Sequence, residues 1–313
     1  MCNPRLFILI GALKVPVDEE GGWIPYGQGS TGLVTRARIP SSGSSVALKA
    51  IPVHIQQQQD LMSVLQQLNT LHSSSHPCVV DFYGADYFQP GSCILIASEF
   101  MDLASFKDVM NCTGPVPERV LGFATCKILE GLEYLHKQRH IIHRDIKPSN
   151  LLLNTRGDVK IGDFGMSTQL QKTLDPANTW VGSTTYMSPE RISGLQYLAN
   201  ADVWSLGICL VELARGTFPY TGDGGKRLEM VELLDKIVDD PPPALPETFS
   251  GELCGFVGAC LCKRMEERPT STALRAHAFV AAHQGACVDD WLKEVAPIVG
   301  ATLGAVSPSR QHG

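Results

Sequence analysis

The sequence predicts an α+β fold, with short strands in the first third of the chain and mostly helices after it. Apolar segments bounded by turn residues indicate strands at 46–49 and 93–98. A helical spacing of apolar residues marks 54–72 and 120–138. A chain of 313 residues is long enough for one large domain, or for two lobes around separate cores.

The composition is that of a soluble globular protein, because 44% of the residues are hydrophobic and 19% are charged. The formal net charge of -6 gives no electrostatic support for binding nucleic acid. Ten cysteines are scattered without paired metal-ligand spacing, which favours reduced core thiols in a cytoplasmic protein. The apolar run 6–13 is too short to cross a bilayer, so we expect no stable membrane insertion.

A glycine-rich turn precedes the first clear strand. It reads Gly27-Gln28-Gly29-Ser30-Thr31-Gly32, Val34 follows it, and segment 46–49 carries Ala47 and ends at Lys49. Glycines allow a backbone to approach phosphate groups closely, because no Cβ obstructs the approach. The turn alone is equally compatible with a loose hairpin. The order of glycine turn, strand and strand lysine favours a phosphate-binding loop.

Two polar segments follow the helix predicted at 120–138. Segment 141–150 contains Asp145, Lys147 and Asn150, and short strands at 151–153 and 159–161 lead from it to Asp163. Phosphoryl transfer from ATP needs an Asp that orients the attacking hydroxyl, an Asn and a second Asp that hold Mg²⁺, and a Lys that neutralises charge. The alternative, a buried strand pair with incidental polar residues, leaves all four side chains unexplained.

In this order, the motifs resemble the glycine loop, catalytic loop and metal-binding segment of protein kinases. The resemblance implies a kinase domain at 23–283. A small antiparallel β-sheet lobe with one main helix would occupy 23–98, a hinge 99–104, and a larger, mostly helical lobe 105–283. ATP and Mg²⁺ are the implied cofactors. The implied ATP contacts are Gly27, Gln28, Gly29, Ser30, Gly32, Val34, Ala47, Lys49, Glu99, Met101, Leu152 and Asp163. Val34, Ala47 and Leu152 are also compatible with ordinary core packing, and both roles can hold at once.

The resemblance extends to one subfamily. Segments 82–84, 182–192 and 233–246 are similar to those of MAP kinase kinases. This implies phosphorylation of Thr and Tyr in the activation loop of a MAP kinase, and activation by an upstream MAP kinase kinase kinase. Thr173 and Thr179 are the implied phosphorylation sites, against the alternative that they are ordinary loop hydroxyls.

Further residues have structural roles by the same resemblance. Asp202 would hold the backbone near His143, Glu190 would pair with Arg268, and Arg144 would bind a phosphate on the activation segment. The helix at 54–72 carries Gln67 where related kinases have the glutamate that pairs with the strand lysine. An amide accepts a hydrogen bond from Lys49 but supplies no charge.

Two alternatives to catalysis by a MAP kinase kinase stay open, and Gln67 motivates the first of them. The chain could be a pseudokinase or scaffold that binds nucleotide and a MAP kinase, or a Ser/Thr kinase at another level of the cascade. Retention of all the phosphate- and metal-handling residues argues against the pseudokinase. Only the identity of the substrate separates the other two functions.

Both ends extend beyond the implied kinase domain. Residues 1–22 are predicted to be an N-terminal extension with a weak docking peptide, because 5–9 supplies one basic residue ahead of apolar ones. Residues 284–313 are predicted to be a tail in which 288–295 forms an amphipathic helix. That helix either docks an upstream activator or packs on its own large lobe.

Overall fold

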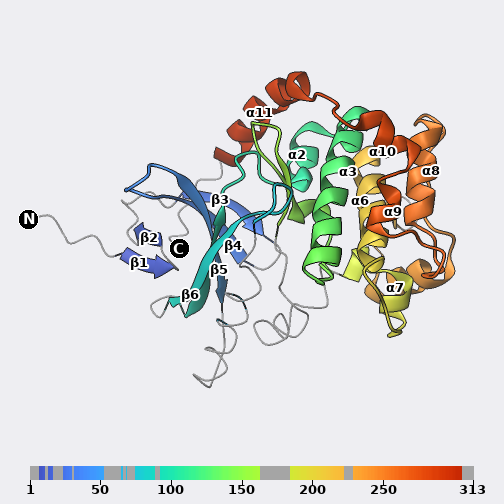
Figure 1. Ribbon diagram of the computed structural model, residues 1–313, viewed down its shortest axis with the longest axis horizontal. Coiled ribbons are helices and arrows are strands. Elements are labelled where there is room, and N and C mark those ends of the chain that lie inside the picture. The colour runs from blue at the N-terminus through green and yellow to red at the C-terminus, as the bar shows by residue number, and fades with distance from the viewer. Residues whose placement is uncertain are drawn as a thin grey trace, which may run out of the picture.

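The computed structural model in Figure 1 places most of the strands in one lobe and the helices in another, and residues 99–104, the crossing segment, lead from the first to the second. The two-lobed α+β arrangement is therefore confirmed. The structure describes residues 7–10, 13–16, 24–29, 32–52, 65, 68, 75–88, 92–162, 184–221 and 228–304.

The small lobe is built on a five-stranded antiparallel sheet in the order β3-β4-β5-β7-β6. Its strands are β3 (Ile24–Gly29), β4 (Gly32–Arg38), β5 (Ser45–Pro52), β6 (Phe82–Phe88) and β7 (Cys93–Glu99). Side chains alternate between the two faces of each strand. On β5, Lys49 and Ile51 therefore lie on one face and Val46 and Leu48 on the other.

One face of this sheet packs on the segment predicted to be a helix at 54–72. Leu65 and Leu68, the residues of that segment that the structure describes, are helical and buried against Ile51 and Ile94. Gln67 lies outside the described residues.

The opposite face packs on a hairpin of β1 (Phe7–Ile10) and β2 (Leu13–Pro16). Ile10 and Val15 are both fully buried against that face, where Leu48 and Leu95 lie. The sequence indicates no strands in 1–22. The hairpin forms because its apolar side chains cover a sheet face that would otherwise meet water.

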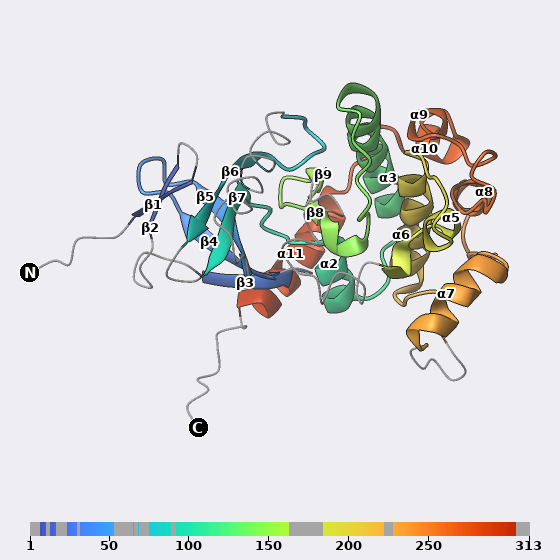
Figure 2. The same ribbon diagram turned by 90° about the horizontal axis from the view of Figure 1, so that it is seen from below.

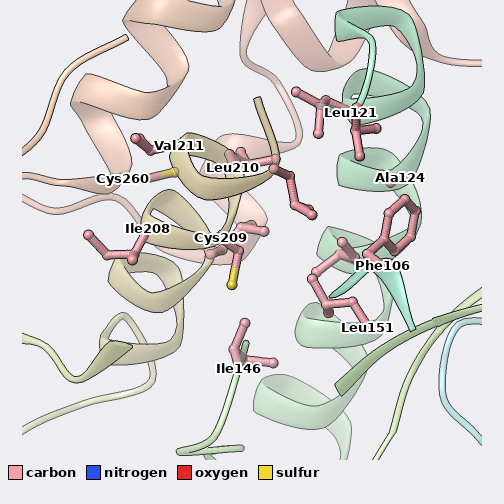
Figure 3. Close-up of a cluster of buried hydrophobic side chains, with 14 of the residues drawn as sticks. Phe106, Leu121, Ala124, Ile146, Leu151, Ile208, Cys209, Leu210, Val211 and Cys260 are labelled. Carbon is pink, nitrogen blue, oxygen red and sulfur yellow. The ribbon is translucent and has the colours of Figure 1, made fainter. Parts of the chain in front are cut away.

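The large lobe surrounds the central helix α6 (Ala201–Arg215), whose residues 201–214 are all buried. Figure 3 shows its side chains between Leu121 of helix α3 (Glu118–Glu133) and Cys260 of helix α8 (Gly251–Cys260), with Ile146 entering from the side of loop 141–150. The core thus supports that loop directly.

The other elements of the large lobe are shorter or peripheral. The helix α2 (Phe106–Thr113) begins at a capping box in which Ser105 and Asp108 satisfy each other's backbone amides. The rest are η3 (Tyr134–Gln138, π-helical), η4 (Pro148–Asn150), η5 (Thr184–Tyr186), α5 (Pro189–Ile192), α7 (Met230–Asp239), α9 (Ser271–Leu274), α10 (Ala278–His283) and α11 (Asp289–Gly304).

A small hairpin of β8 (Leu151–Leu153) and β9 (Val159–Ile161) connects the lobes. On one side, Leu153 exchanges backbone hydrogen bonds with Leu103 and Ala104 of the crossing segment. On the other side, the Ile161 amide donates to the Cys78 carbonyl, and the Ile161 carbonyl accepts from the Val80 amide. The hairpin, which lies between loop 141–150 and Gly162, is therefore hydrogen-bonded to the crossing segment and to residues 78–80.

Within the described ranges, none of the helices is both long and apolar enough to cross a membrane. Nine cysteines lie in these ranges and all are free thiols; five are buried, three are partly buried and Cys287 is exposed, so the prediction of core positions holds for only some of them.

Candidate active site

Loop 141–150 brings three of the predicted catalytic side chains together. The Lys147 ammonium lies 2.8 Å from Oδ2 of Asp145. The amide nitrogen of Asn150 donates to the same oxygen at 2.9 Å and to the Asp145 carbonyl at 2.8 Å. Lys147 and Asn150 are buried, so these polar contacts form in a medium where charge interactions are strong.

The geometry of Asn150 suits a hard cation. Its amide nitrogen donates to Asp145, which places the amide oxygen on the other branch of the carboxamide. A carboxamide oxygen combined with a carboxylate is a donor set that Mg²⁺ accepts. The second predicted ligand, Asp163, lies outside the described residues. Gly162, the residue before it, donates its backbone amide to the Asn150 carbonyl at 2.8 Å.

Asp202, at the start of α6, anchors the loop from below. Its two oxygens accept the backbone amides of His143 and Arg144, each at 2.8 Å. The imidazole of His136 adds a third contact at 2.8 Å. Burial alone would raise the pKa of Asp202, but the hydrogen bonds and charge of its partners hold the pKa below its ordinary value. Asp202 therefore stays an anion with no exposed surface.

This anchor restrains a strained turn. Arg144 has φ +71°, a left-handed conformation that few non-glycine residues adopt. Its carbonyl accepts a hydrogen bond from Arg191 at 2.9 Å, and both guanidinium groups lie over the ring of Tyr197, at 5.8 and 5.3 Å. Thr173 and Thr179 lie outside the described residues, so binding of a phosphate by Arg144 stays a prediction.

On the small lobe, the sheet register groups the predicted ATP-contacting residues. Val34 lies directly opposite Lys49, and Ala47 is on the same face two residues earlier. Gly29 pairs with Gly32, so β3 and β4 carry the glycine-rich turn between them. The structure gives the backbone of Gly27, Gln28 and Gly29 but does not describe Ser30.

Glu99 and Met101 lie at the start of the crossing segment, and the side chain of Glu99 is already engaged in contacts within the protein. One carboxylate oxygen lies 2.7 Å from the Lys160 ammonium of β9 and accepts the Asp81 amide at 3.2 Å. The Glu99 backbone amide also donates to the Asp81 carbonyl, at 2.8 Å. Leu152 pairs with Lys160 in the β8–β9 hairpin and is half-buried.

Glu190 and Arg268 form a bidentate ion pair outside loop 141–150. The two guanidinium nitrogens donate to the two carboxylate oxygens at 2.8 and 3.0 Å. Burial would raise the pKa of Glu190, but the Arg268 guanidinium outweighs it and lowers that pKa. Arg268 also lies 5.2 Å from the ring of Trp204. The pair ties the end of the activation segment to the core of the large lobe.

Three residues that contact the predicted site residues are not marked by any local pattern in the sequence. His136 reaches Asp202 because a π-helical turn follows α3, and Lys160 and Tyr197 are identified only by partners distant in the chain. No spacing rule connects residues 58 or more positions apart, such as Arg144 and Asp202. Their contacts become visible only in the folded chain.

Residues 25–280 match the family described as protein kinase domain. The chain is 42% identical to MAP kinase kinase 3 and to MAP kinase kinase 1 of Arabidopsis thaliana, over 84% and 81% of this chain and 50% and 72% of those proteins. It is 36% identical to the dual specificity MAP kinase kinase 1 of Dictyostelium discoideum, over 85% of this chain and 54% of that protein. The chain thus spans about half the length of several curated relatives that it matches.

Proposed function

We propose a phosphoryl-transfer function for this chain, which belongs to the protein kinase family and, within it, to the MAP kinase kinases. The proposed reaction moves the terminal phosphoryl group of ATP to a Thr and a Tyr in the activation loop of a MAP kinase. The observation that carries it is the cluster of Asp145, Lys147 and Asn150, held by the buried Asp202. We place the protein in the cytoplasm.

Each residue of the cluster has a step to perform. The Asp145 carboxylate accepts a hydrogen bond from the attacking hydroxyl and orients it. Lys147, 2.8 Å from that carboxylate, supplies positive charge beside the phosphoryl group in transit. Lys49 contacts the α- and β-phosphates from β5. Mg²⁺, held by Asn150 and Asp163, would neutralise charge between the phosphates.

The nucleotide base would lie between the two lobes. Val34 and Ala47 would cover one side of the adenine and Leu152 the other, and backbone groups from Glu99 to Met101 would bind its edge. The shared face of Val34 and Ala47 and the engagement of the Glu99 side chain with Lys160 support this placement.

Regulation is proposed to depend on Thr173 and Thr179, phosphorylated by an upstream MAP kinase kinase kinase. Arg144 would bind the resulting phosphate. Its guanidinium and that of Arg191 both lie over the ring of Tyr197, and two cations beside one ring favour the binding of an anion. The kinase domain is proposed to run from 23 to 283, with an N-terminal extension at 1–22 and a tail at 284–313. Docking of a MAP kinase by 5–9 stays a prediction.

A kinase assay tests the proposal. The chain with T173E and T179E should phosphorylate at least one member of a panel of kinase-dead MAP kinases, on both the Thr and the Tyr of the activation loop. The same protein with K49M serves as the control. Phosphate incorporation that K49M leaves unchanged would exclude the chain as its source.

The assay also separates the rival functions. A pseudokinase would bind ATP and a MAP kinase without transfer, and a kinase of another level would modify Ser or Thr of a different protein. Q67E is informative here, because a charged partner for Lys49 should raise the activity of a catalyst and cannot create activity where the chemistry is missing.

A further inference from the structure

Helix α11 turns one apolar stripe toward the rest of the protein. Val288, Leu292, Val295 and Val299 recur at steps of four and three residues, and all four are buried. Asp290, Lys293 and Glu294 between them are exposed, whereas Trp291 and Ala296 are partly buried against the core of the large lobe. The apolar side of α11 is therefore covered by its own chain.

The start of α11 is fixed to the large lobe. Arg119 of α3 donates a hydrogen bond to the carbonyl of Cys287, one residue before the apolar stripe begins. Leu292 packs on the β8–β9 turn, since its Cδ1 lies 3.4 Å from the place of a Cβ at Gly157. Along its length the helix packs on α2.

The end of α11 reaches the other lobe. Sixteen helical residues span about 24 Å at 1.5 Å per residue. Figures 1 and 2 show the red helix leaving the large lobe, passing α2 and ending beside β3 of the small lobe. The strand beside it is the one that leads into the glycine-rich turn.

The turn beneath α11 is bound to the segment that joins the lobes. Thr155 donates its backbone amide and its hydroxyl to the two carboxylate oxygens of Asp102, at 2.7 and 2.8 Å. The ion pair of Lys160 and Glu99 ties the same hairpin to the end of β7. The helix therefore lies against a hairpin that is itself bonded at two places to the segment joining the lobes.

We propose that α11 is a strut between the lobes, which positions β3 and its glycine-rich turn relative to the large lobe. The crossing segment at the hinge permits one lobe to rotate against the other. The contact between the end of α11 and β3 is a second connection between the lobes, and it removes part of that freedom. Its effect on nucleotide affinity rests on the proposed function, whereas its effect on β3 does not.

Two truncations and two substitutions test the strut. The chain ending at residue 298 loses Val299 and the last turn of α11, and the chain ending at 304 is its control. G300A should stabilise the last turn, because alanine favours helix over glycine and nothing lies within 4 Å of its new methyl group. G258A is the matched control on α8, where the space around the methyl group is equally open.

The first readout is amide hydrogen exchange without nucleotide. In the chain ending at 298, the β3 amides should exchange faster than in the chain ending at 304, while those of β7 keep their rates. G300A should slow exchange in β3, and G258A should not. Unchanged β3 exchange in the chain ending at 298 overturns the strut.

The second readout is the affinity for ATP with Mg²⁺, measured by calorimetry. The chain ending at 298 should bind about fivefold more weakly than the control, which is about 1 kcal/mol. If β3 loses protection and both chains bind ATP equally, the strut stands but does not act on the nucleotide site. If the control binds no ATP while β3 responds, the proposed function fails and the strut stands.

Discussion

At the scale of single residues, the buried carboxylate of Asp202 holds the geometry of loop 141–150. It accepts two backbone amides and the His136 imidazole with no access to water. In D202N, an amide group would face one of these donors instead of an oxygen. We expect a loss of about 2 to 3 kcal/mol of unfolding free energy, as for a hydrogen bond to a charged group.

Urea denaturation measures that loss, with D240N at an exposed site as the control. A D202N protein as stable as the control would show that the anchor contributes nothing to the fold.

The ion pair of Glu99 and Lys160 is a second residue-scale case. K160M leaves the Glu99 carboxylate, whose side chain is only 14% exposed, without its cation, and we expect a loss of about 2 to 3 kcal/mol. Adding E99Q should restore most of it, because the glutamine oxygen can still accept the Asp81 amide. A double-mutant cycle by chemical denaturation measures the coupling. Additive losses would contradict a direct interaction.

At this scale the sequence identified residues that belong to contiguous motifs. Asp145, Lys147 and Asn150 lie within six positions of one another, and the structure brings them into contact. His136 and Lys160 were not predicted, because their partners are 66 and 61 positions away and no local pattern marks them.

At the scale of elements, the β1–β2 hairpin completes the small lobe. I10A removes part of a fully buried side chain from the face that Leu48 and Leu95 share. We expect a destabilisation of about 2 to 4 kcal/mol, from lost apolar burial and the remaining cavity. Thermal unfolding monitored by circular dichroism measures it, with the exposed S41A as the control. Equal midpoints would show that the hairpin does not stabilise the sheet.

Helices α3 and α9 are joined by a pair whose stability depends on pH. The guanidinium of Arg275, just after α9, lowers the pKa of Glu133 from 4.5 to about 2. The folded pKa is below the unfolded one, so the unfolded chain takes up the proton first as pH falls. The stabilisation is complete above about pH 5 and is lost between about pH 4.5 and 2.

E133Q should therefore lose less stability than the wild type over this range, and R275Q should behave in the same way. Urea denaturation between pH 2 and 6 measures the difference. Parallel curves for all three proteins would rule out this contribution.

The elements themselves were only partly predictable. The sequence indicated the strands at 46–49 and 93–98 because apolar residues are continuous there, and β5 and β7 contain them. It gave no strand in 1–22, since Ile10 and Val15 become strand residues only by covering a sheet formed elsewhere. For the helix at 288–295, the expected roles were docking of an upstream activator or packing on the large lobe, and neither included its approach to β3.

At the scale of the whole molecule, two lobes contribute different residues of the site, and neither lobe completes it alone. The small lobe supplies Lys49 and the glycine-rich turn, and the large lobe supplies the cluster around Asp145. The order of motifs was enough to predict the two lobes and the reaction class. It could not specify how the lobes are braced, because that depends on packing between distant segments such as α11 and β3.

The most direct test of the central claim is the steady-state rate of phosphate transfer from ATP to a kinase-dead MAP kinase. The chain with T173E and T179E is compared with the same chain carrying D145N. If Asp145 orients the attacking hydroxyl, kcat falls by about 100-fold or more while the KM for ATP is nearly unchanged. Equal kcat values for the two proteins would contradict the assignment of loop 141–150 as the catalytic centre.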